Sequence, residues 1–228
     1  MAKIVEIFHS IQGEGKYLGV PQVFVRFFEC NIHCSWCDTP HSIGDTTRHF
    51  KEYSLEQLAL EIKKHWPGSH SISLTGGEPL VQADFIAQLL GVLQNLRMTS
   101  YLETNGILPN ELSKVIDRVD IVSMDLKLPS STQCGPFWKE HEEFIQIAKR
   151  KDLFLKVVVS NKTTIEDLQQ AVDLVARSAP DVPFILQPNF FDMKEGVIDR
   201  CVEFQKVCLK RLSDVRIVPQ VHKFMKLR

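Results

Sequence analysis

Residues 71–104 read SISLTGGEPLVQADFIAQLLGVLQNLRMTSYLET, and this stretch decides the fold. Two runs with β-strand character, SISLT (71–75) and SYLET (100–104), flank a segment whose apolar residues recur at helical spacing. Those apolar residues are Phe85, Ile86, Leu89, Leu90 and Leu93. A strand, a helix and a second strand in this order predict two parallel strands joined by a right-handed crossover.

The same alternation continues in both directions along the chain. Further strands are expected at VFVRFF (23–28), DIVSMDL (120–126), LFLKVVVS (153–160) and FILQPN (184–189), with VRIVPQ (215–220) as a short seventh. Further helices are expected at 55–66, after a capping box at Ser54 and Gln57, and at 138–149, 165–176 and 197–212, with a weaker one at 111–116. Six β/α units without a repeat or linker predict one domain over 1–228, built as an open doubly wound sheet or as part of a barrel.

The composition limits the class of protein. Of the 228 residues, 44% are hydrophobic and 24% are charged, which suits a globular unit with a sizeable core. The formal net charge of -1 provides no overall polycation, so no nucleic-acid partner is expected. The start, MAKIVEIFHS, has no apolar leader core, and no apolar run approaches the roughly 20 residues of a bilayer span. A cytoplasmic protein without a membrane partner is therefore expected.

Three of the six cysteines are clustered in CNIHCSWC (30–37). The short spacings let the thiolates of Cys30, Cys34 and Cys37 converge on one inorganic centre. Zinc is one alternative, with His33 or His41 completing a closed set of four ligands. A [4Fe-4S] cluster explains a set of three thiolates better, because one iron then stays free to bind a substrate or cofactor.

Polar clusters follow several of the predicted strands. They are ECNIHCSWCD (29–38), TGGEP (75–79), ETNG (103–106), DLK (125–127) and QPN (187–189). In either architecture the C-terminal ends of parallel strands meet at one edge, so these clusters are expected to share one ligand site. The paired glycines of TGGEP allow the backbone to press against a ligand or to turn sharply.

Arg26 interrupts an otherwise apolar strand, and a buried arginine needs a partner. One possibility is an internal ion pair with Glu29 or with Glu14 of the turn SIQGEG (10–15). The other is that its planar guanidinium holds a substrate carboxylate through two hydrogen bonds.

Taken together, CNIHCSWC, TGGEP, ETNG and QPN resemble the radical S-adenosylmethionine (SAM) superfamily. Within it, SIQGEG, the Arg26 strand, the CDT after the cysteines and the PQVHK near the C-terminus are similar to the 7-carboxy-7-deazaguanine synthase family. The resemblance implies a partial, laterally open TIM-like barrel of six parallel strands. It also implies a [4Fe-4S] cluster whose free iron binds SAM, and the resulting 5′-deoxyadenosyl radical, rather than a side chain, carries the chemistry. The implied reaction converts 6-carboxy-5,6,7,8-tetrahydropterin to 7-carboxy-7-deazaguanine, a lyase step of queuosine-type biosynthesis that releases ammonia.

The same resemblance implies roles for particular residues. Cys30, Cys34 and Cys37 would ligate the cluster, and Thr39 would ligate Mg²⁺. Residues expected to contact the cofactor are Trp36, Cys37, Asp38, Gly77, Glu103, Ser123, Asp125, Lys127, Gln187, Pro188 and Asn189. Residues expected to contact the substrate are Ile11, Gln12, Gly13, Arg26, Thr75 and His222.

The chain departs from the family pattern in two places. Many relatives have a compact SPK where this chain has SMDLKLPSS (123–131), which leaves open which of Ser123, Asp125 and Lys127 contacts the cofactor. The tail KFMKLR (223–228) extends past His222, whereas a terminal carboxylate completes the site in some relatives.

Two other functions compete with this interpretation. A glycyl-radical-enzyme activase shares CxxxCxxC, GGEP and MDLK, but it acts on a protein loop. A non-enzymatic zinc-binding module would hold zinc with the three cysteines and a histidine. The resemblance also implies an external one-electron donor of the flavodoxin or ferredoxin type and a homodimer.

Overall fold

The computed structural model describes residues 1–44 and 49–227. Over these residues nine strands form one sheet in the order β3-β1-β2-β4-β5-β6-β7-β8-β9. The strands are β1 (Ala2–Ile11), β2 (Pro21–Phe27), β3 (Lys51–Tyr53), β4 (Ser71–Gly76), β5 (Ser100–Thr104), β6 (Ile121–Asp125), β7 (Asp152–Val159), β8 (Phe184–Pro188) and β9 (Val215–Ile217). The α-helices are α1 (Leu55–His65), α2 (Ala83–Asn95), α3 (Pro109–Val115), α4 (Pro129–Thr132), α5 (Trp138–Ala148), α6 (Ile165–Ser178), α7 (Val197–Cys208) and α8 (Val221–Met225). Short 3-10 helices lie at Pro40–Ser42, Pro79–Gln82, Ile116–Arg118 and Phe190–Glu195.

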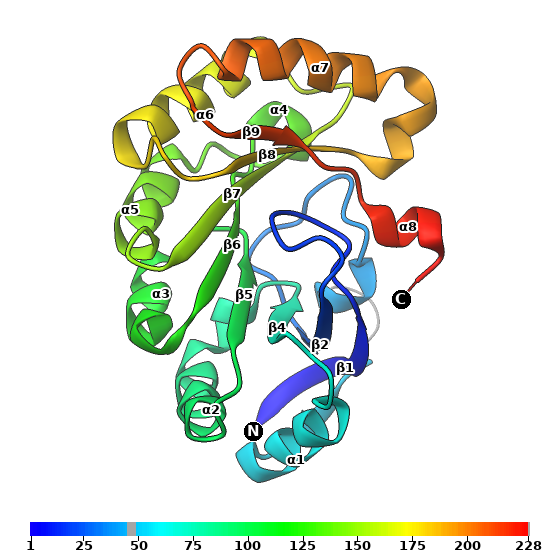
Figure 1. Ribbon diagram of the computed structural model, residues 1–228, viewed down its shortest axis with the longest axis vertical. Coiled ribbons are helices and arrows are strands. Elements are labelled where there is room, and N and C mark those ends of the chain that lie inside the picture. Colours follow the sequence, from blue (N-terminus) through cyan, green and yellow to red (C-terminus); the bar gives the residue numbers. More distant parts are fainter. Residues whose placement is uncertain (45–48, 228) are drawn as a thin grey trace.

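The sheet is a curved, laterally open barrel. Strands β2 and β4 to β9 run parallel, and the edge strands β3 and β9 are not paired with each other. Helices α2, α3, α5, α6 and α7 follow the outside of the arc, while the loops of the N-terminal third lie on its inner side (Figure 1). This arrangement confirms the predicted partial barrel, and none of the described helices is long and apolar enough to cross a bilayer.

The strands are apolar because helices cover one face and packed side chains fill part of the other. Tyr101, Ile121, Phe154 and Ile185 come from the N-terminal halves of β5 to β8 and form a separate buried cluster, against which Tyr17 packs. These side chains fill the barrel interior at the N-terminal ends of the strands. The space that remains lies at the C-terminal ends, where the polar clusters of the sequence are found.

Not every strand is parallel, which corrects the prediction. β1 pairs antiparallel with β2 on one side and with β3 on the other, and both β1 and β3 were missed. A register shift between Ile4 and Glu6 breaks the two-residue alternation of β1 and hides its pattern. β3 is only three residues long, too short to show a period. The SIQGEG segment therefore begins as the end of a strand and continues into the loop that leads to β2.

Most predicted helices are confirmed. Ser54 caps α1 together with the Gln57 side chain, as the capping box predicts. α2 contains all the apolar residues on which its prediction rested, and α5 and α6 end within two residues of their expected limits. α7 ends at Cys208 and not at Leu212. The weak pattern at 111–116 corresponds to α3. The connection between β6 and α5 contains the short helix α4.

Candidate active site

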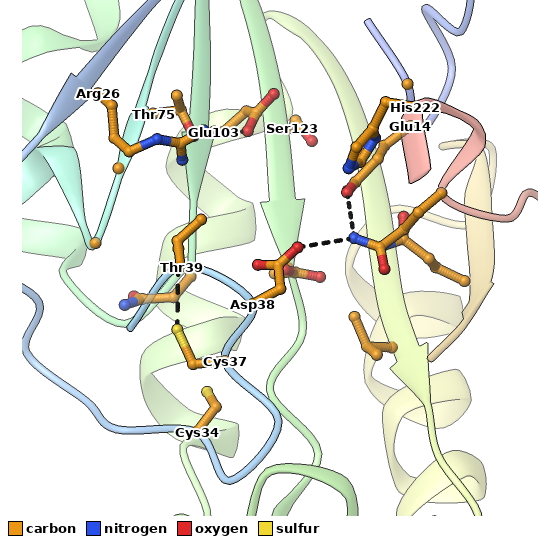
Figure 2. A pocket seen from close by; sticks show the side chains of 18 of the residues that line it. Glu14, Arg26, Cys34, Cys37, Asp38, Thr39, Thr75, Glu103, Ser123 and His222 are labelled. Carbon is orange, nitrogen blue, oxygen red and sulfur yellow. Dashed lines mark hydrogen bonds between the residues drawn. The ribbon is translucent and has the colours of Figure 1, made fainter. Parts of the chain in front are cut away.

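A cavity of about 390 Å³ lies on the inner side of the sheet, at the C-terminal ends of the parallel strands. Its lining includes all three cysteines of the CxxxCxxC motif, the β1–β2 loop and the C-terminal segment. Figure 2 shows Arg26, Thr75 and Glu103 along one side, Glu14 and His222 along another, and Cys34 and Cys37 below Thr39 and Asp38. Residues from both ends of the chain therefore face one space.

The cysteine loop, residues 29–42, is held by hydrogen bonds across its base and at its middle. Glu29, at a positive φ of 82°, turns the chain out of β2, and its N–H donates to the Ser42 carbonyl at 2.8 Å. Farther along, the Ser35 N–H donates to the Thr132 carbonyl at 2.9 Å, and the Trp36 indole donates to Ser131 Oγ at 3.1 Å. Helix α4 thus supports the cysteine loop from the adjoining β6–α5 connection.

All three cysteines of the CxxxCxxC motif are partly buried and line this cavity. In an iron–sulfur cluster each thiolate binds a different iron, so three thiolates around one cavity suit such a cluster. Among the described residues, Glu14, Asp38 and His222 have ligand atoms that all lie within 4.8 Å of one another and form a separate candidate metal site.

The glycines of TGGEP allow two chain segments to meet. A β-carbon on Gly77 would lie 2.3 Å from the Glu29 carbonyl oxygen, and one on Gly76 would lie 2.2 Å from the Phe27 carbonyl oxygen. The end of β4 therefore packs directly against the backbone that leads into Cys30. The sequence predicted close contact with a ligand or a sharp turn here, and what the structure shows is close contact with the cysteine loop.

Glu78, in the same motif, joins the ends of two strands. Its buried carboxylate accepts hydrogen bonds from Thr104 Oγ1 at 2.9 Å and from the Asn105 and Leu80 N–H groups at 2.7 and 3.0 Å. Burial raises the pKa of Glu78 to about 7, although these hydrogen bonds favour its charged form. Asn105 in turn donates from Nδ2 to Asn31 Oδ1 at 2.7 Å, which connects the end of β5 to the cysteine loop.

A polar wall centred on Glu103 forms the side of the cavity that is uppermost in Figure 2. The Glu103 carboxylate accepts hydrogen bonds from Thr75 Oγ1 at 2.8 Å, Gln12 Nε2 at 2.8 Å and Ser73 Oγ at 3.2 Å. Arg26 lies on the same side and donates from Nε to Glu6 Oε1 at 2.7 Å. Glu6, and neither Glu14 nor Glu29, is thus its ion-pair partner, because the bulge in β1 places Glu6 directly opposite Arg26.

A charged network ties the N-terminal loop to the C-terminal segment. Gln220 Nε2 donates to Glu14 Oε1 at 2.8 Å and to Asp38 Oδ2 at 3.1 Å, as the dashed lines of Figure 2 show. Lys156 forms an ion pair with Glu14, and Lys223 lies 3.3 Å from Asp38. Each carboxylate therefore already faces an ammonium group, which disfavours a divalent ion among Glu14, Asp38 and His222 even though their ligand atoms lie close together.

Comparison with known proteins agrees with this geometry. Residues 25–175 match the family model described as the Radical SAM superfamily. The chain is 37% identical to the 7-carboxy-7-deazaguanine synthase of Geobacter sulfurreducens, over 98% of this chain and 97% of the relative. It is 36% identical to that of Thermoplasma acidophilum, over 97% and 96%. Among solved structures, QueE from Escherichia coli has the same fold, with a TM-score of 0.66 at 21% identity over 97% of this chain and 94% of the other.

The chain belongs to the 7-carboxy-7-deazaguanine synthase family of radical SAM enzymes. Membership in the superfamily implies a [4Fe-4S] cluster and SAM as cofactors. The interpretation as a non-enzymatic zinc module is thereby excluded.

The residues present fit these cofactors. Cys30, Cys34 and Cys37 share the cavity, and burial raises the pKa of Cys30 to about 11 and of Cys34 to about 12, so both are thiols until a metal displaces the proton. Two acceptor atoms of the lining, Asp125 Oδ1 and Gln187 Oε1, are buried without a hydrogen-bond partner in the described part of the chain. Such atoms suit a ligand rich in donors, such as the hydroxyl and amino groups of SAM.

Nearly every residue that the sequence predicted to bind the cluster, SAM or the substrate lines the cavity. The lining includes Ile11, Gln12, Gly13, Arg26, Cys30, Cys34, Trp36, Cys37, Asp38, Thr39, Thr75, Gly77, Glu103, Ser123, Asp125, Lys127, Gln187, Asn189 and His222. Pro188 does not line it, because its side chain is buried in the sheet at the end of β8. Which of the lining residues contacts which ligand remains a prediction.

Sequence reasoning missed several residues of the same cavity. Glu6 lies in the unrecognised strand β1, and Lys156 lies inside the apolar run LFLKVVVS, where a lone lysine is itself a signal. Lys156 is 9% exposed and forms ion pairs with Glu14 and, at 3.7 Å, with Asp125. Glu14 was considered only as a partner for Arg26. Its pairing with Lys156 required the three-dimensional fold.

Proposed function

We propose that this enzyme converts 6-carboxy-5,6,7,8-tetrahydropterin into 7-carboxy-7-deazaguanine with loss of ammonia. The proposal is carried by one observation: the polar wall of Gln12, Thr75 and Glu103 and the guanidinium of Arg26 share a single cavity with the three cysteines. Relatives that match nearly the full length carry the name of this synthase, which supports the same substrate.

The proposed substrate matches the charges of the cavity. A pterin presents N–H donors along its pyrimidine edge and, in this case, a carboxylate on its other ring. The sequence predicted a cofactor contact for Glu103, but its hydrogen bonds to Gln12 and Thr75 group it with the substrate side. Held by neutral donors, Glu103 offers a negatively charged acceptor for those N–H groups, and Arg26 offers a cation for the carboxylate. In this orientation His222, Gly13 and Ile11 line the remaining substrate side.

The cofactor subsite lies beside the cysteines, below the polar wall in the view of Figure 2. When bound there, the cluster and SAM would supply a carbon-centred radical that removes a hydrogen atom from the substrate. Trp36, Asp38, Gly77, Asp125, Lys127, Gln187 and Asn189 would position the cofactor, and Ser123 lies between the two subsites. The orphaned acceptors of Asp125 and Gln187 support this placement.

Thr39 is proposed as the protein ligand of a Mg²⁺ ion shared with the substrate. Its hydroxyl lies 3.9 Å from Cys37 Sγ, at the boundary between the cysteine loop and the cavity. Mg²⁺ binds hard oxygen ligands and commonly keeps several waters, so one hydroxyl together with substrate oxygens is a sufficient site.

The experiment that tests the function is anaerobic reconstitution with iron and sulfide, followed by incubation with SAM, a reductant and the carboxylated tetrahydropterin. We expect stoichiometric release of the deazapurine and ammonia, detected by mass spectrometry. A glycyl-radical activase would be indifferent to the pterin. Cleavage of SAM without any deazapurine would reject the proposed substrate.

Replacement of Thr39 tests the magnesium site. In Thr39→Ala we expect a normal iron content and a weaker response of the rate to added Mg²⁺, because the cysteines remain but one oxygen ligand is lost. The rate is measured across a Mg²⁺ titration in parallel with the parent enzyme. An unchanged titration curve would remove Thr39 from the metal site.

By family resemblance we also propose a homodimer and an external one-electron donor of the flavodoxin or ferredoxin type. Sedimentation equilibrium gives the oligomeric state, and a mass of one chain, 26.1 kDa, would contradict the dimer. Turnover driven by a reduced flavodoxin or ferredoxin, in place of a chemical reductant, tests the donor.

A further inference from the structure

His141 is a buried, functionally unassigned histidine beneath the cysteine loop. It belongs to α5, is 0% exposed and does not line the cavity. Its Nε2 lies 3.2 Å from the carbonyl oxygen of Asn105 and 3.4 Å from the backbone nitrogen of Lys127. The rings of Phe137 and Trp138 lie 6.4 and 6.5 Å from its own, edge-on, which fixes the orientation of the imidazole.

The position of His141 relative to the sheet suggests why an imidazole is used here. The ladder between β5 and β6 ends at the pair Thr104 and Met124. Asn105 and Lys127 lie just beyond that pair. The Asn105 carbonyl is therefore outside the ladder, and its hydrogen-bond donor is a side chain from the outer helix layer, His141.

The protonation state of His141 is constrained by its surroundings. Burial lowers the pKa of His141 to about 4, so the ring is neutral at neutral pH and carries one N–H. If the proton were on Nδ1, it would be a buried donor without a partner among the described residues. With the proton on Nε2, the ring donates to the Asn105 carbonyl at 3.2 Å. Nε2 then cannot accept from the Lys127 N–H, so the 3.4 Å approach of Lys127 is a packing contact and the hydrogen bond of His141 is the one to Asn105.

His141 contacts the backbones of Asn105 and Lys127, and the side chains of these two residues contact the cysteine loop. Asn105 donates from Nδ2 to Asn31, the residue after Cys30. The Lys127 ammonium lies 5.0 Å from the centre of the ring of Trp36, a residue between Cys34 and Cys37 in the sequence. The same ammonium lies 2.8 Å from the Asp125 carboxylate. A displacement of either strand end would therefore move a contact to the loop that carries the cluster ligands.

We propose that His141 is a positioning residue: its hydrogen bond to the Asn105 carbonyl fixes the end of β5, and Asn105, whose side chain donates to Asn31, thereby aligns the cysteine loop for the cluster and SAM. The proposal rests on membership in the radical SAM superfamily and not on the identity of the pterin. If the enzyme failed to bind or convert the pterin, the proposed role of His141 would still stand.

The test compares three variants of the full chain. His141→Phe keeps a ring of similar size without hydrogen-bonding nitrogens, and His141→Gln places an amide N–H near the position of Nε2. Phe144→Leu is the matched control, because Phe144 is also 0% exposed on α5 but is not a neighbour of Asn105 or Lys127 through any hydrogen bond. Each variant is reconstituted anaerobically, and three quantities are measured: iron and sulfide per chain, the SAM dissociation constant with the accompanying change in the EPR spectrum of the reduced cluster, and the melting temperature of the cluster-free chain.

We expect His141→Phe to weaken SAM binding about tenfold and to alter the EPR change on SAM addition, the effect of one lost positioning hydrogen bond. His141→Gln should restore most of the affinity. Phe144→Leu should lower the melting temperature but leave the affinity and the spectrum as in the parent. ¹⁵N NMR of labelled histidine in the cluster-free chain should show the proton on Nε2 between pH 6 and pH 8.

Two results would overturn the proposal. One is a His141→Phe enzyme with the parent's SAM affinity and EPR spectrum. The other is a loss of affinity that follows the melting temperature equally in His141→Phe and Phe144→Leu, because a merely structural role predicts that correlation.

Discussion

At the scale of single residues, Glu103 is the group on which the polar wall of the cavity converges. Its donors Thr75, Ser73 and Gln12 are all neutral, and in the described part of the chain no lysine or arginine forms a salt bridge with it. The other acidic residues of the cavity, such as Glu14 and Asp125, are paired with lysines. Glu103 thus retains a charge that a donor-bearing ligand can use.

Glu103→Gln is expected to weaken pterin binding roughly ten- to a hundredfold, the range for losing a charge-assisted hydrogen bond. Iron content and SAM cleavage should remain, because Glu103 lies away from the cysteines. Anaerobic calorimetry of the reconstituted enzyme with the pterin measures the effect. Glu111→Gln, on the surface helix α3, is the control, and equal pterin affinity in the two variants would contradict the role of Glu103.

Glu14 should make stability depend on pH. Burial alone would raise its pKa, but the Lys156 ammonium and hydrogen bonds from Lys156 and Gln220 lower it to about 2. A carboxyl whose pKa is depressed in the folded state stabilises fully above its unfolded pKa, here 4.5, and loses that contribution as the pH falls towards 2. The shift corresponds to a contribution on the order of 3 kcal/mol at neutral pH.

Glu14→Gln should therefore lower the free energy of unfolding at pH 7 and flatten its decline between pH 4.5 and pH 2. Urea unfolding of the cluster-free chain at a series of pH values measures both effects. If the variant and the parent lost stability in parallel over this range, the ion pair with Lys156 would not be the cause.

At the scale of elements, the sequence predicted the helices and the central parallel strands because each buries a regular pattern. α2 and α6 have one apolar face, and β7 is an unbroken buried run, so local composition is sufficient to recognise them. β1 was not predicted, because its bulge shifts the alternation of apolar and polar residues and because Glu6 turns towards the cavity. The site residues next to motifs were predicted, whereas Lys156 and Gln220 depend on contacts between segments far apart in the chain.

The junction of β4 with the cysteine loop leads to a prediction about Gly77. Gly77→Ala places a β-carbon 2.3 Å from the Glu29 carbonyl, a backbone atom that cannot swing aside, so the loop must move. We expect reduced iron binding on reconstitution and a loss of roughly 1–3 kcal/mol of stability, typical of overpacking.

The control for this substitution is Gly91→Ala in helix α2, where an added β-carbon meets no atom within 4 Å. Alanine should stabilise that helix by up to about 1 kcal/mol and leave iron binding unchanged. Chemical denaturation and iron analysis are carried out on both variants. Full iron loading of Gly77→Ala would show that the close approach is not needed for the cluster.

At the scale of the whole molecule, the two ends of the chain close one side of the cavity together. The Val221 N–H donates to the Gly13 carbonyl at 2.9 Å, and a β-carbon on Gly13 would lie 2.2 Å from His222 Nδ1. Gln220 links Glu14 to Asp38, and α8 carries Phe224 and Met225 exposed on its outer side. α8 lies apart from the outer helices, on the open side of the arc (Figure 1).

A chain shortened to residues 1–219 should keep the sheet, since β9 ends at Ile217, and should still bind iron and cleave SAM. Pterin binding should be lost, because Gln220 and His222 are removed and Glu14 and Asp38 lose their common partner. The full-length Phe224→Ser variant, altered only on the exposed side of α8, should bind the pterin normally. Retained pterin affinity in the shortened chain would contradict this division of the site.

The contact between Gly13 and His222 also sets an order of events during synthesis. A ribosome makes the residues of the β1–β2 loop and the cysteine loop long before it reaches Gln220 and α8. On the growing polypeptide, the wall formed by Gln220 and α8 is added after both of these loops, so the cysteines are open to iron–sulfur delivery from that side until Gln220 and α8 have been made.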